Sequence, residues 1–181
     1  MNARVEALFT APEGSAPMVD HDRIRLVDGG IEGDRYLNGS GYYSPFDVCE
    51  VTLVDAAALD TIREEAGIDL TDGRHRRNVV VRGADLDELL EATFRLGDAE
   101  TGAVLRGTRP RPPCTHVEQV GGQDGIARAL KGRRGGICAD VVDPGRVAVG
   151  DGVEILEADP RTEGRRIVDR LKRSLGRTHG E

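Results

Sequence analysis

The chain has 181 residues, a formal net charge of −7 and 38% hydrophobic residues. This length predicts one domain, and this composition is typical of a globular rather than a disordered chain. The acidic balance argues against general nucleic-acid binding, which needs a broad basic face. No apolar run approaches the roughly 18 residues that cross a bilayer, and the first residues lack the apolar stretch of a secretory signal. We therefore expect a cytoplasmic protein with no membrane or nucleic-acid partner.

Short alternating or apolar stretches, separated by Gly, Pro and Asp, predict a mainly β protein with a few short helices. In chain order, the expected strands cover residues 4–8, 23–27, 48–54, 79–81, 93–96, 104–105, 137–142 and 147–156. The expected helices cover residues 56–66, 85–90, 125–130 and 165–175. Strands at intervals of roughly ten residues favour a closed or strongly curved β-barrel over a fold of alternating strands and helices.

The last 23 residues differ from the rest in charge and pattern. They are rich in arginine, and Val168, Leu171 and Leu175 fall on one helical face. We expect a β-barrel domain over residues 1–158 and a basic amphipathic helix or tail over residues 159–181, with the helix packed on the barrel.

The three cysteines are widely spaced, odd in number and contain no CxxC pair, so neither a disulfide framework nor a structural zinc site is expected. Cys49 and Cys138 lie in apolar strand stretches, where a cysteine is usually a small buried side chain. Cys114 instead follows two prolines, which favour an extended, exposed segment. In such a segment His116 faces the same side, so Cys114 and His116 are expected to share a pocket.

Basic side chains gather where strands are expected to end, beside glycine or proline. The three clusters are Arg74, His75, Arg76 and Arg77; Arg106, Arg109 and Arg111; and Lys131, Arg133 and Arg134. Strand ends of a barrel converge on one rim, where several guanidinium groups could bind a phosphate or diphosphate. For any single arginine, pairing with a surface carboxylate is the simpler explanation, whereas for the three clusters together both interpretations stay open. Arginines near Cys114 would also favour its thiolate, which can ligate a soft metal, carry a persulfide or act as a nucleophile.

Several of these stretches occur together in one order. They are Gly-Ile-Glu-Gly-Asp-Arg-Tyr (30–36), Arg-Arg-Asn-Val-Val-Val-Arg-Gly-Ala-Asp-Leu (76–86), Arg-Pro-Pro-Cys (111–114), Arg-Gly-Gly-Ile-Cys-Ala-Asp-Val-Val (134–142) and Val-Ala-Val-Gly-Asp-Gly-Val (147–153). This order resembles the MOSC domain, which forms the C-terminal part of molybdenum cofactor sulfurases and also occurs as small stand-alone proteins. The resemblance extends over about residues 4–156.

The resemblance implies a β-rich barrel related to the pyruvate kinase insertion domain, and binding of a molybdopterin-type molybdenum cofactor. It implies that Cys114 carries sulfur or ligates molybdenum. The family's basic strand-end motif matches Arg76, Arg77 and Asn78, and its Gly-Asp turn matches the segment ending at Arg35. Larger relatives add a pyridoxal-phosphate cysteine desulfurase, for which this chain has no room. Other relatives reduce N-hydroxylated substrates with the bound cofactor.

The first hypothesis is a molybdenum-cofactor protein in which Cys114 faces the metal as the catalytic residue and metal ligand. The cofactor-binding residues expected around it are Arg35, Arg76, Arg77, Asn78, Arg111, His116 and Arg134. The protein would either transfer sulfur, with a cysteine desulfurase as partner, or reduce small N-hydroxylated substrates with electrons from an electron-transfer protein. A non-catalytic carrier of the cofactor is the alternative. A hydrolase using Cys114 and His116 is a third hypothesis, for which no orienting third residue is evident.

Overall fold

A computed structural model describes residues 2–41 and 49–158 of the chain. In chain order its elements are β1 (Arg4–Thr10), β2 (Val19–Asp20), β3 (Arg23–Val27), β4 (Gly30–Ile31), β5 (Val51–Asp55), α1 (Ala56–Ala66), β6 (Val79–Arg82), α2 (Leu86–Leu89), β7 (Thr93–Leu96), β8 (Ala103–Pro110), α3 (His116–Gly121), α4 (Ile126–Ala129), the 3-10 turn η1 (Gly132–Gly135), β9 (Ile137–Asp143), β10 (Gly145–Ala148) and β11 (Val153–Glu157). The prediction of a mainly β protein with a few short helices is confirmed.

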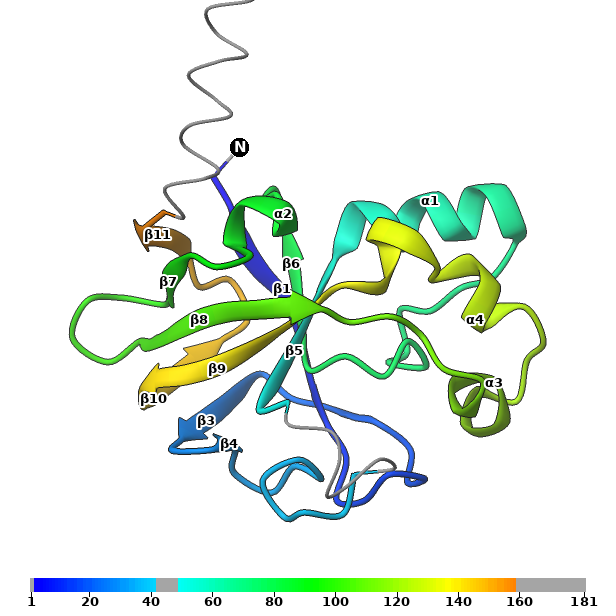
Figure 1. Cartoon of the computed structure of the whole chain (residues 1–181), viewed down its shortest axis with the longest axis horizontal. Helices are drawn as coiled ribbons and strands as arrows, with labels where there is room; N and C mark the ends of the chain where they lie inside the picture. The colour runs from blue at the N-terminus through cyan, green and yellow to red at the C-terminus, as the bar shows by residue number, and fades with distance from the viewer. Residues whose placement is uncertain (1, 42–48, 159–181) are drawn as a thin grey trace, which may run out of the picture.

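Eight strands form one mixed sheet in the order β11-β7-β8-β9-β5-β6-β1-β2, and β10, β3 and β4 form a second, small sheet. Within the large sheet only β5 and β6 run parallel, and α1 forms part of the connection between them. Figure 1 shows α1, α3 and α4 gathered on one side of the molecule, while β7 to β11 lie on the other.

The predicted closed barrel is wrong, because the large sheet is open and has β2 and β11 as its edges. Near these ends, the start of β1 meets the chain just before β11: an isolated bridge joins Arg4 to Gly152, and backbone hydrogen bonds join Ala3 and Val5 to residues 150, 151 and 153. The strand expected over residues 147–156 is broken by a turn in which Asp151 N–H donates to the Ala148 carbonyl, and Gly150 adopts a φ of 95°. The chain therefore leaves the small sheet after β10 and enters the large sheet as the short strand β11.

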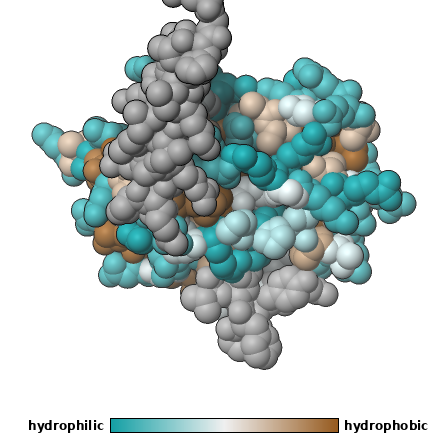
Figure 2. All heavy atoms as spheres, turned by 45° about the horizontal axis from the view of Figure 1, so that its top comes forward, coloured by the Kyte–Doolittle hydropathy of each residue, from teal (hydrophilic) through white to brown (hydrophobic). Residues whose placement is uncertain are grey.

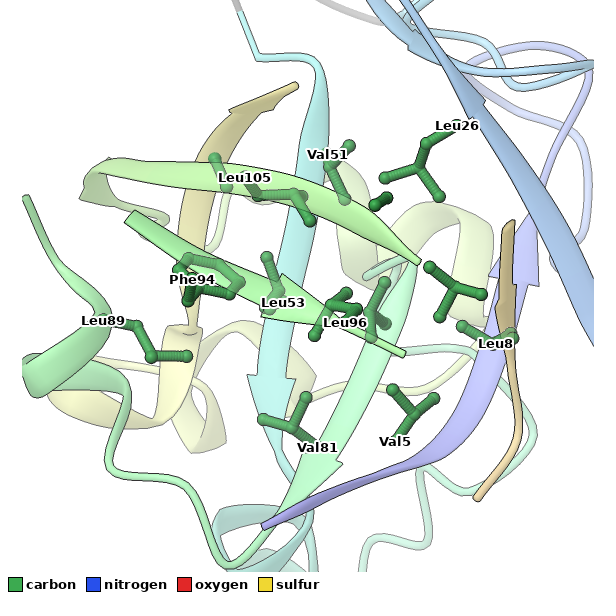
Figure 3. Packing of buried hydrophobic residues seen from close by; sticks show 14 of the residues in the cluster. Val5, Leu8, Leu26, Val51, Leu53, Val81, Leu89, Phe94, Leu96 and Leu105 are labelled. Atoms are coloured by element: carbon green, nitrogen blue, oxygen red, sulfur yellow. The ribbon is translucent and has the colours of Figure 1, made fainter. Parts of the chain in front are cut away.

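Two apolar cores lie on opposite faces of the central strands. The inner core includes Val5, Leu53, Phe94 and Leu105, whose side chains point toward one another across the curved sheet in Figure 3. The second core packs α1, α3 and α4 against the other face, with Val54 and Val80 from the sheet. Alternate residues of β5 and β6 thus serve different cores, as strand geometry requires.

Helix α1 is delimited by local signals at both ends. The Asp55 carboxylate accepts a hydrogen bond from Ala57 N–H at 3.0 Å, and Gly67 ends the helix in the left-handed conformation. Leu59 and Ile62 are spaced to face the second core. The helix predicted over residues 56–66 is confirmed, whereas the one predicted over 165–175 and the tail 159–181 lie outside the described residues.

Hydrophilic side chains dominate the face drawn in Figure 2, with apolar side chains in small areas between them. In the described ranges, none of the helices has the length and apolar character that crossing a membrane would require.

Candidate functional site

Four arginines from three separate segments line one pocket together with Cys114 and His116. Arg35 follows β4, Arg76 and Arg77 precede β6, and Arg111 follows β8. The register of the sheet explains their meeting, since a row of paired residues joins the end of β8 to the beginning of β6 through β9 and β5. Gly14, Tyr36, Pro112 and Val117 complete the wall, and the cavity volume is about 40 Å³.

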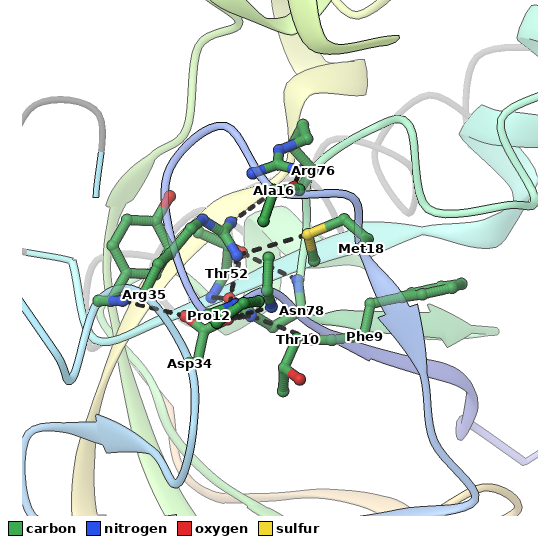
Figure 4. A network of polar contacts seen from close by, with 12 residues as sticks. Phe9, Thr10, Pro12, Ala16, Met18, Asp34, Arg35, Thr52, Arg76 and Asn78 are labelled. Atoms are coloured by element: carbon green, nitrogen blue, oxygen red, sulfur yellow. Dashed lines mark hydrogen bonds and ion pairs between the residues drawn. The ribbon is translucent and has the colours of Figure 1, made fainter. Parts of the chain in front are cut away.

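One buried carboxylate organises the floor beneath these arginines. Asp34 has no exposed surface and accepts hydrogen bonds from the Ala11 and Tyr36 backbone N–H groups, from Arg35 at 3.0 Å and from Asn78 at 3.1 Å. Figure 4 shows this network between the loop that follows β1 and the residues just before β6. The glycine-rich turn at 30–35 therefore places an ion pair in the interior, rather than serving only as a surface turn.

Asn78 belongs to this floor and does not line the pocket. Its side-chain oxygen accepts hydrogen bonds from the hydroxyl and backbone N–H of Thr52, at 2.7 and 3.1 Å. Its side-chain nitrogen donates to the Phe9 carbonyl and to Asp34. With every side-chain position engaged, Asn78 holds β1, β5 and the turn at Asp34 together.

Arg77 is fully engaged with backbone carbonyls. Its guanidinium donates to the carbonyls of Gly135, His75 and Arg111, at 2.7, 3.0 and 3.1 Å. Burial is the main cause that lowers the pKa of Arg77 to about 10. Arg77 therefore fixes the backbone of the segment that leads to Cys114.

Arg76 is engaged with a different segment. Its φ is 63°, and its two terminal nitrogens donate to the carbonyls of Gly14 and Ala16. Burial, followed by repulsion from Arg35, lowers the pKa of Arg76 to about 10. At both residues burial is the main cause of the lowered pKa, and repulsion from a neighbouring pocket arginine adds to it.

Arg35, Arg111 and Tyr36 form a stacked group at the pocket wall. The Arg35 guanidinium carbon lies 4.4 Å from the centre of the Tyr36 ring, and that of Arg111 lies 5.8 Å from it. Arg111 also donates to the Tyr36 hydroxyl at 3.0 Å. The Tyr36 ring thus holds the guanidinium groups of Arg35 and Arg111 near each other, and both residues line the pocket.

Cys114 is half-buried, and it reaches the pocket on the segment between β8 and α3. The predicted sharing of one pocket by Cys114 and His116 is observed, but the reason is different. Thr115 has helical dihedral angles and α3 begins at His116, so the segment is not extended there. A His116 ring nitrogen, Nε2, lies 3.1 Å from the Gly14 carbonyl oxygen, and Nδ1 lies 3.4 Å from Oε1 of Gln119.

The third basic cluster lies elsewhere. Arg134 forms an ion pair with Glu65 at 2.6 Å, and Arg133 pairs with Asp87. Both line a separate groove beside α1 and α2. The sequence predicted Arg134 as a cofactor-binding residue. The structure places Arg134 outside the pocket that holds the other arginines.

The two remaining cysteines agree with the expectation of small buried side chains, and His75 is buried as well. Cys49 and Cys138 are buried. His75 is buried, and burial lowers its pKa to about 3, while its Nδ1 accepts the Arg77 backbone N–H. Among the described residues, no group of three His, Cys, Asp or Glu side chains is placed to hold a metal ion.

Sequence reasoning missed Tyr36 and Gly14 as pocket residues. Tyr36 was within reach, because it directly follows the Asp34-Arg35 pair in a stretch already singled out. Gly14 contributes a backbone carbonyl, and no side-chain pattern signals such a contribution.

A model of the MOSC domain family matches residues 46–154, which is more than half of the chain. The chain belongs to the MOSC domain family. Its fold resembles that of the YuaD protein of Bacillus subtilis, with a TM-score of 0.70 and 24% identity over 86% of this chain and 96% of that one. YiiM from Geobacillus stearothermophilus gives a TM-score of 0.61 at 15% identity, covering 86% of this chain and 75% of YiiM.

YiiM from Escherichia coli gives a TM-score of 0.59 at 21% identity, over 87% of this chain and 70% of YiiM. A comparison with curated protein sequences finds no match. The solved structures therefore support the MOSC fold, and the family model supports membership.

Proposed function

We propose that this MOSC protein binds a molybdopterin-type molybdenum cofactor, with the cofactor phosphate in the arginine pocket and the Cys114 thiolate facing the metal. The observation that carries the proposal is the meeting of four arginines and a half-buried cysteine at one pocket. MOSC domains are associated with this cofactor, so the family and the local chemistry point in the same direction.

The pocket residues fit the anionic part of such a cofactor. Among the described residues, Asp34 is the carboxylate that pairs with Arg35 in the network beneath the pocket, and burial lowers the pKa of Arg76 and Arg77. A bound oxyanion would accept charge-assisted hydrogen bonds from the guanidinium groups at the pocket wall. A cavity volume of about 40 Å³ suits a phosphate-sized group rather than a whole pterin.

The pocket arginines divide into two roles in this proposal. Arg35, Arg76 and Arg111 would hold the oxyanion, because their guanidinium groups lie at the pocket wall. Arg77 would position the Cys114 segment through the Arg111 and Gly135 carbonyls. Neither Asn78 nor Arg134 would contact the cofactor, since one is engaged in the floor and the other lies in a separate groove.

When bound, the cofactor would supply two-electron redox chemistry at its metal. We propose reduction of small N-hydroxylated bases to amines, which consumes two electrons and two protons and releases water. An electron-transfer partner would deliver the electrons. The residues of this chain would bind the cofactor, orient it through Arg35 and Arg111, and present the Cys114 thiolate.

The first experiment measures cofactor binding. The full chain is purified from a host that makes molybdenum cofactor, and molybdenum content and oxidised-pterin fluorescence are measured. We expect both signals for the wild type, a strong loss for Arg111→Gln, and a loss of bound metal for Cys114→Ala. Arg95→Gln is the matched control, because Arg95 pairs with Glu154 across β7 and β11 and does not line the pocket, so we expect both signals to stay unchanged. A wild type without either signal, even after reconstitution, would rule out the proposal.

The second experiment measures the reaction. Cofactor-loaded protein is given an artificial electron donor and an N-hydroxylated base, and amine formation is followed. We expect amine from the wild type and none from Cys114→Ala. A loaded but inactive wild type would instead identify a cofactor carrier, and restored activity of a cofactor-dependent acceptor enzyme with a cysteine desulfurase present would identify sulfur transfer.

A further inference from the structure

A short loop, which we call the strap (residues 12–17), passes over the arginine pocket. It connects β1 to β2, whose residues Thr10 and Val19 pair with each other at its base. Four of its six side chains are exposed and the other two are half-buried, so none is buried in either apolar core. The strap is therefore held by hydrogen bonds rather than by apolar packing, which is typical of segments that open at low cost.

Two side chains that line the pocket, Arg76 and His116, form hydrogen bonds with the strap. Both terminal nitrogens of Arg76 donate to strap carbonyls, one to Gly14 at 2.7 Å and one to Ala16. Nε2 of His116 contacts the same Gly14 oxygen at 3.1 Å. Ser40 adds contacts at the strap's start, to the Pro12 carbonyl and from Gly14 N–H. The strap thus occupies two groups that an anionic ligand would use.

The strap also lies between two cavities. Gly14 lines the arginine pocket of about 40 Å³, while Pro17 and the adjoining Met18 line a second cavity of about 190 Å³. Arg76 lines both cavities, and it is the residue that ties down the strap. A ligand larger than a single oxyanion group cannot occupy both cavities while the strap remains in place.

We propose that the strap is a displaceable gate, which moves away when the cofactor binds and joins the two cavities into one groove. This inference rests on the proposed function. Displacement exchanges neutral carbonyl acceptors at Arg76 and His116 for an anion, which adds the attraction between opposite charges to the hydrogen bonds of the Arg76 guanidinium. Only molecules with an open strap bind the cofactor in this proposal. The apparent affinity therefore equals the affinity of the open state multiplied by the fraction of molecules in which the strap is open.

The decisive variant replaces residues 12–17 by Asn-Gly, which closes β1 and β2 as a two-residue hairpin. Binding of molybdenum cofactor and, separately, of inorganic phosphate is measured on the full chain with and without this replacement. We expect the cofactor to bind about tenfold or more tightly without the strap, and phosphate, which already fits the closed cavity and gains only the groups that the strap occupied, to gain less than the cofactor does. Ser15→Ala is the matched control, because it alters an exposed strap side chain and leaves the strap in place.

The outcomes separate the gate from the proposed function. If the wild type binds cofactor and the strapless variant binds it equally or more weakly, the strap is a wall of the site. That result overturns the gate. Absence of cofactor binding by both proteins refutes the proposed function and the gate with it. Binding by the strapless variant alone supports both.

A measurement on the unaltered protein covers the case in which the strapless variant does not fold. Glu13 is exposed on the strap, so a glutamate-specific protease can report its opening. We expect saturating cofactor to accelerate cleavage after Glu13 several-fold, whereas inorganic phosphate leaves it unchanged. Cleavage that cofactor slows or does not affect contradicts the gate.

Discussion

At the scale of single residues, the buried Asp34 carboxylate is expected to matter more for stability than any surface acid. Asp34→Asn keeps the shape of the side chain but removes the negative charge that pairs with Arg35. It also replaces one of the two oxygens that accept the four hydrogen bonds. Breaking a buried ion pair costs about 3–5 kcal/mol. We expect a loss of that order in the free energy of unfolding, measured by urea denaturation.

The control for Asp34 is an ion pair of the same chemistry at the surface. Glu154→Gln removes the partner of Arg95, and the Glu154 side chain is 64% exposed. Exposed pairs contribute about 1 kcal/mol or less. Equal losses for Asp34→Asn and Glu154→Gln would show that the buried network is not what holds the turn at 30–36.

His75 predicts a pH dependence of stability. Burial lowers its pKa in the folded state to about 3, from 6.5 in an unfolded chain, so unfolded molecules bind the proton first as pH falls. The stability contributed by neutral His75 is therefore complete above pH 6.5 and is lost progressively toward pH 3. From pH 7 to pH 5 this loss amounts to about 2 kcal/mol.

The matching variant is His75→Asn, whose side-chain oxygen can still accept the Arg77 backbone N–H but does not titrate. Urea denaturation at pH 7 and pH 5 gives the change in unfolding free energy for each protein. We expect the wild type to lose about 2 kcal/mol more than the variant between these two pH values. Parallel pH dependences would contradict the buried, neutral state of His75.

At the scale of elements, the turn from η1 into β9 is expected to tolerate no side chain at Gly136. Its φ is 85°, and an added Cβ would collide with the Leu53 carbonyl of the central strand β5. The same turn supplies the Gly135 and Gly136 carbonyls to Arg77 and Arg111. Gly136→Ala is therefore expected to cost about 3 kcal/mol or more in unfolding free energy and to weaken oxyanion binding.

Gly150 provides the comparison for Gly136. Its φ is 95°, yet an added Cβ would meet nothing within 4 Å. Gly150→Ala carries the conformational strain alone, which costs about 1–2 kcal/mol. Chemical denaturation of both variants separates the collision from the strain, and a similar loss for the two would mean that β5 can move away from residue 136.

How far the sequence predicted these elements depends on how local their causes are. The helix at 56–66 and the strand at 23–27 follow from residues within each segment, and both are confirmed. Closure of the barrel depends on pairing between distant strands, which no residue pattern within a strand reveals, and the observed sheet is open. In the site, the position of Cys114 and Arg76 at strand ends indicated that they meet, and both line one pocket. The hydrogen bonds of Asn78 with Thr52 and Asp34 join segments distant in sequence, and only the three-dimensional structure reveals them.

At the scale of the whole molecule, a negatively charged chain carries one positively charged pocket. The formal net charge is −7, yet Arg35, Arg76, Arg77 and Arg111 line one pocket, and in the described part of the chain Asp34 is the buried carboxylate beneath them. A generally acidic surface repels polyanions such as nucleic acids, while the pocket attracts a small anion once it is within about 10 Å. This arrangement favours small phosphorylated ligands over large polyanions.

The division of the chain at residue 158 can be tested at the same scale. Among the described residues, both apolar cores lie between Val5 and Val153, within the domain predicted over residues 1–158. Removing residues 159–181 is therefore expected to preserve cooperative thermal unfolding and to change the unfolding free energy by less than about 1 kcal/mol.

Removal of residues 153–181 is the stringent comparison for this truncation. It deletes β11, whose residues pair with β7, and takes Val153 from the edge of the inner core. We expect this longer deletion to abolish or broaden the unfolding transition, because Phe94 and Leu96 then lose their neighbouring strand. If the shorter deletion does the same, residues 159–181 belong to the folded domain and the boundary at 158 is wrong.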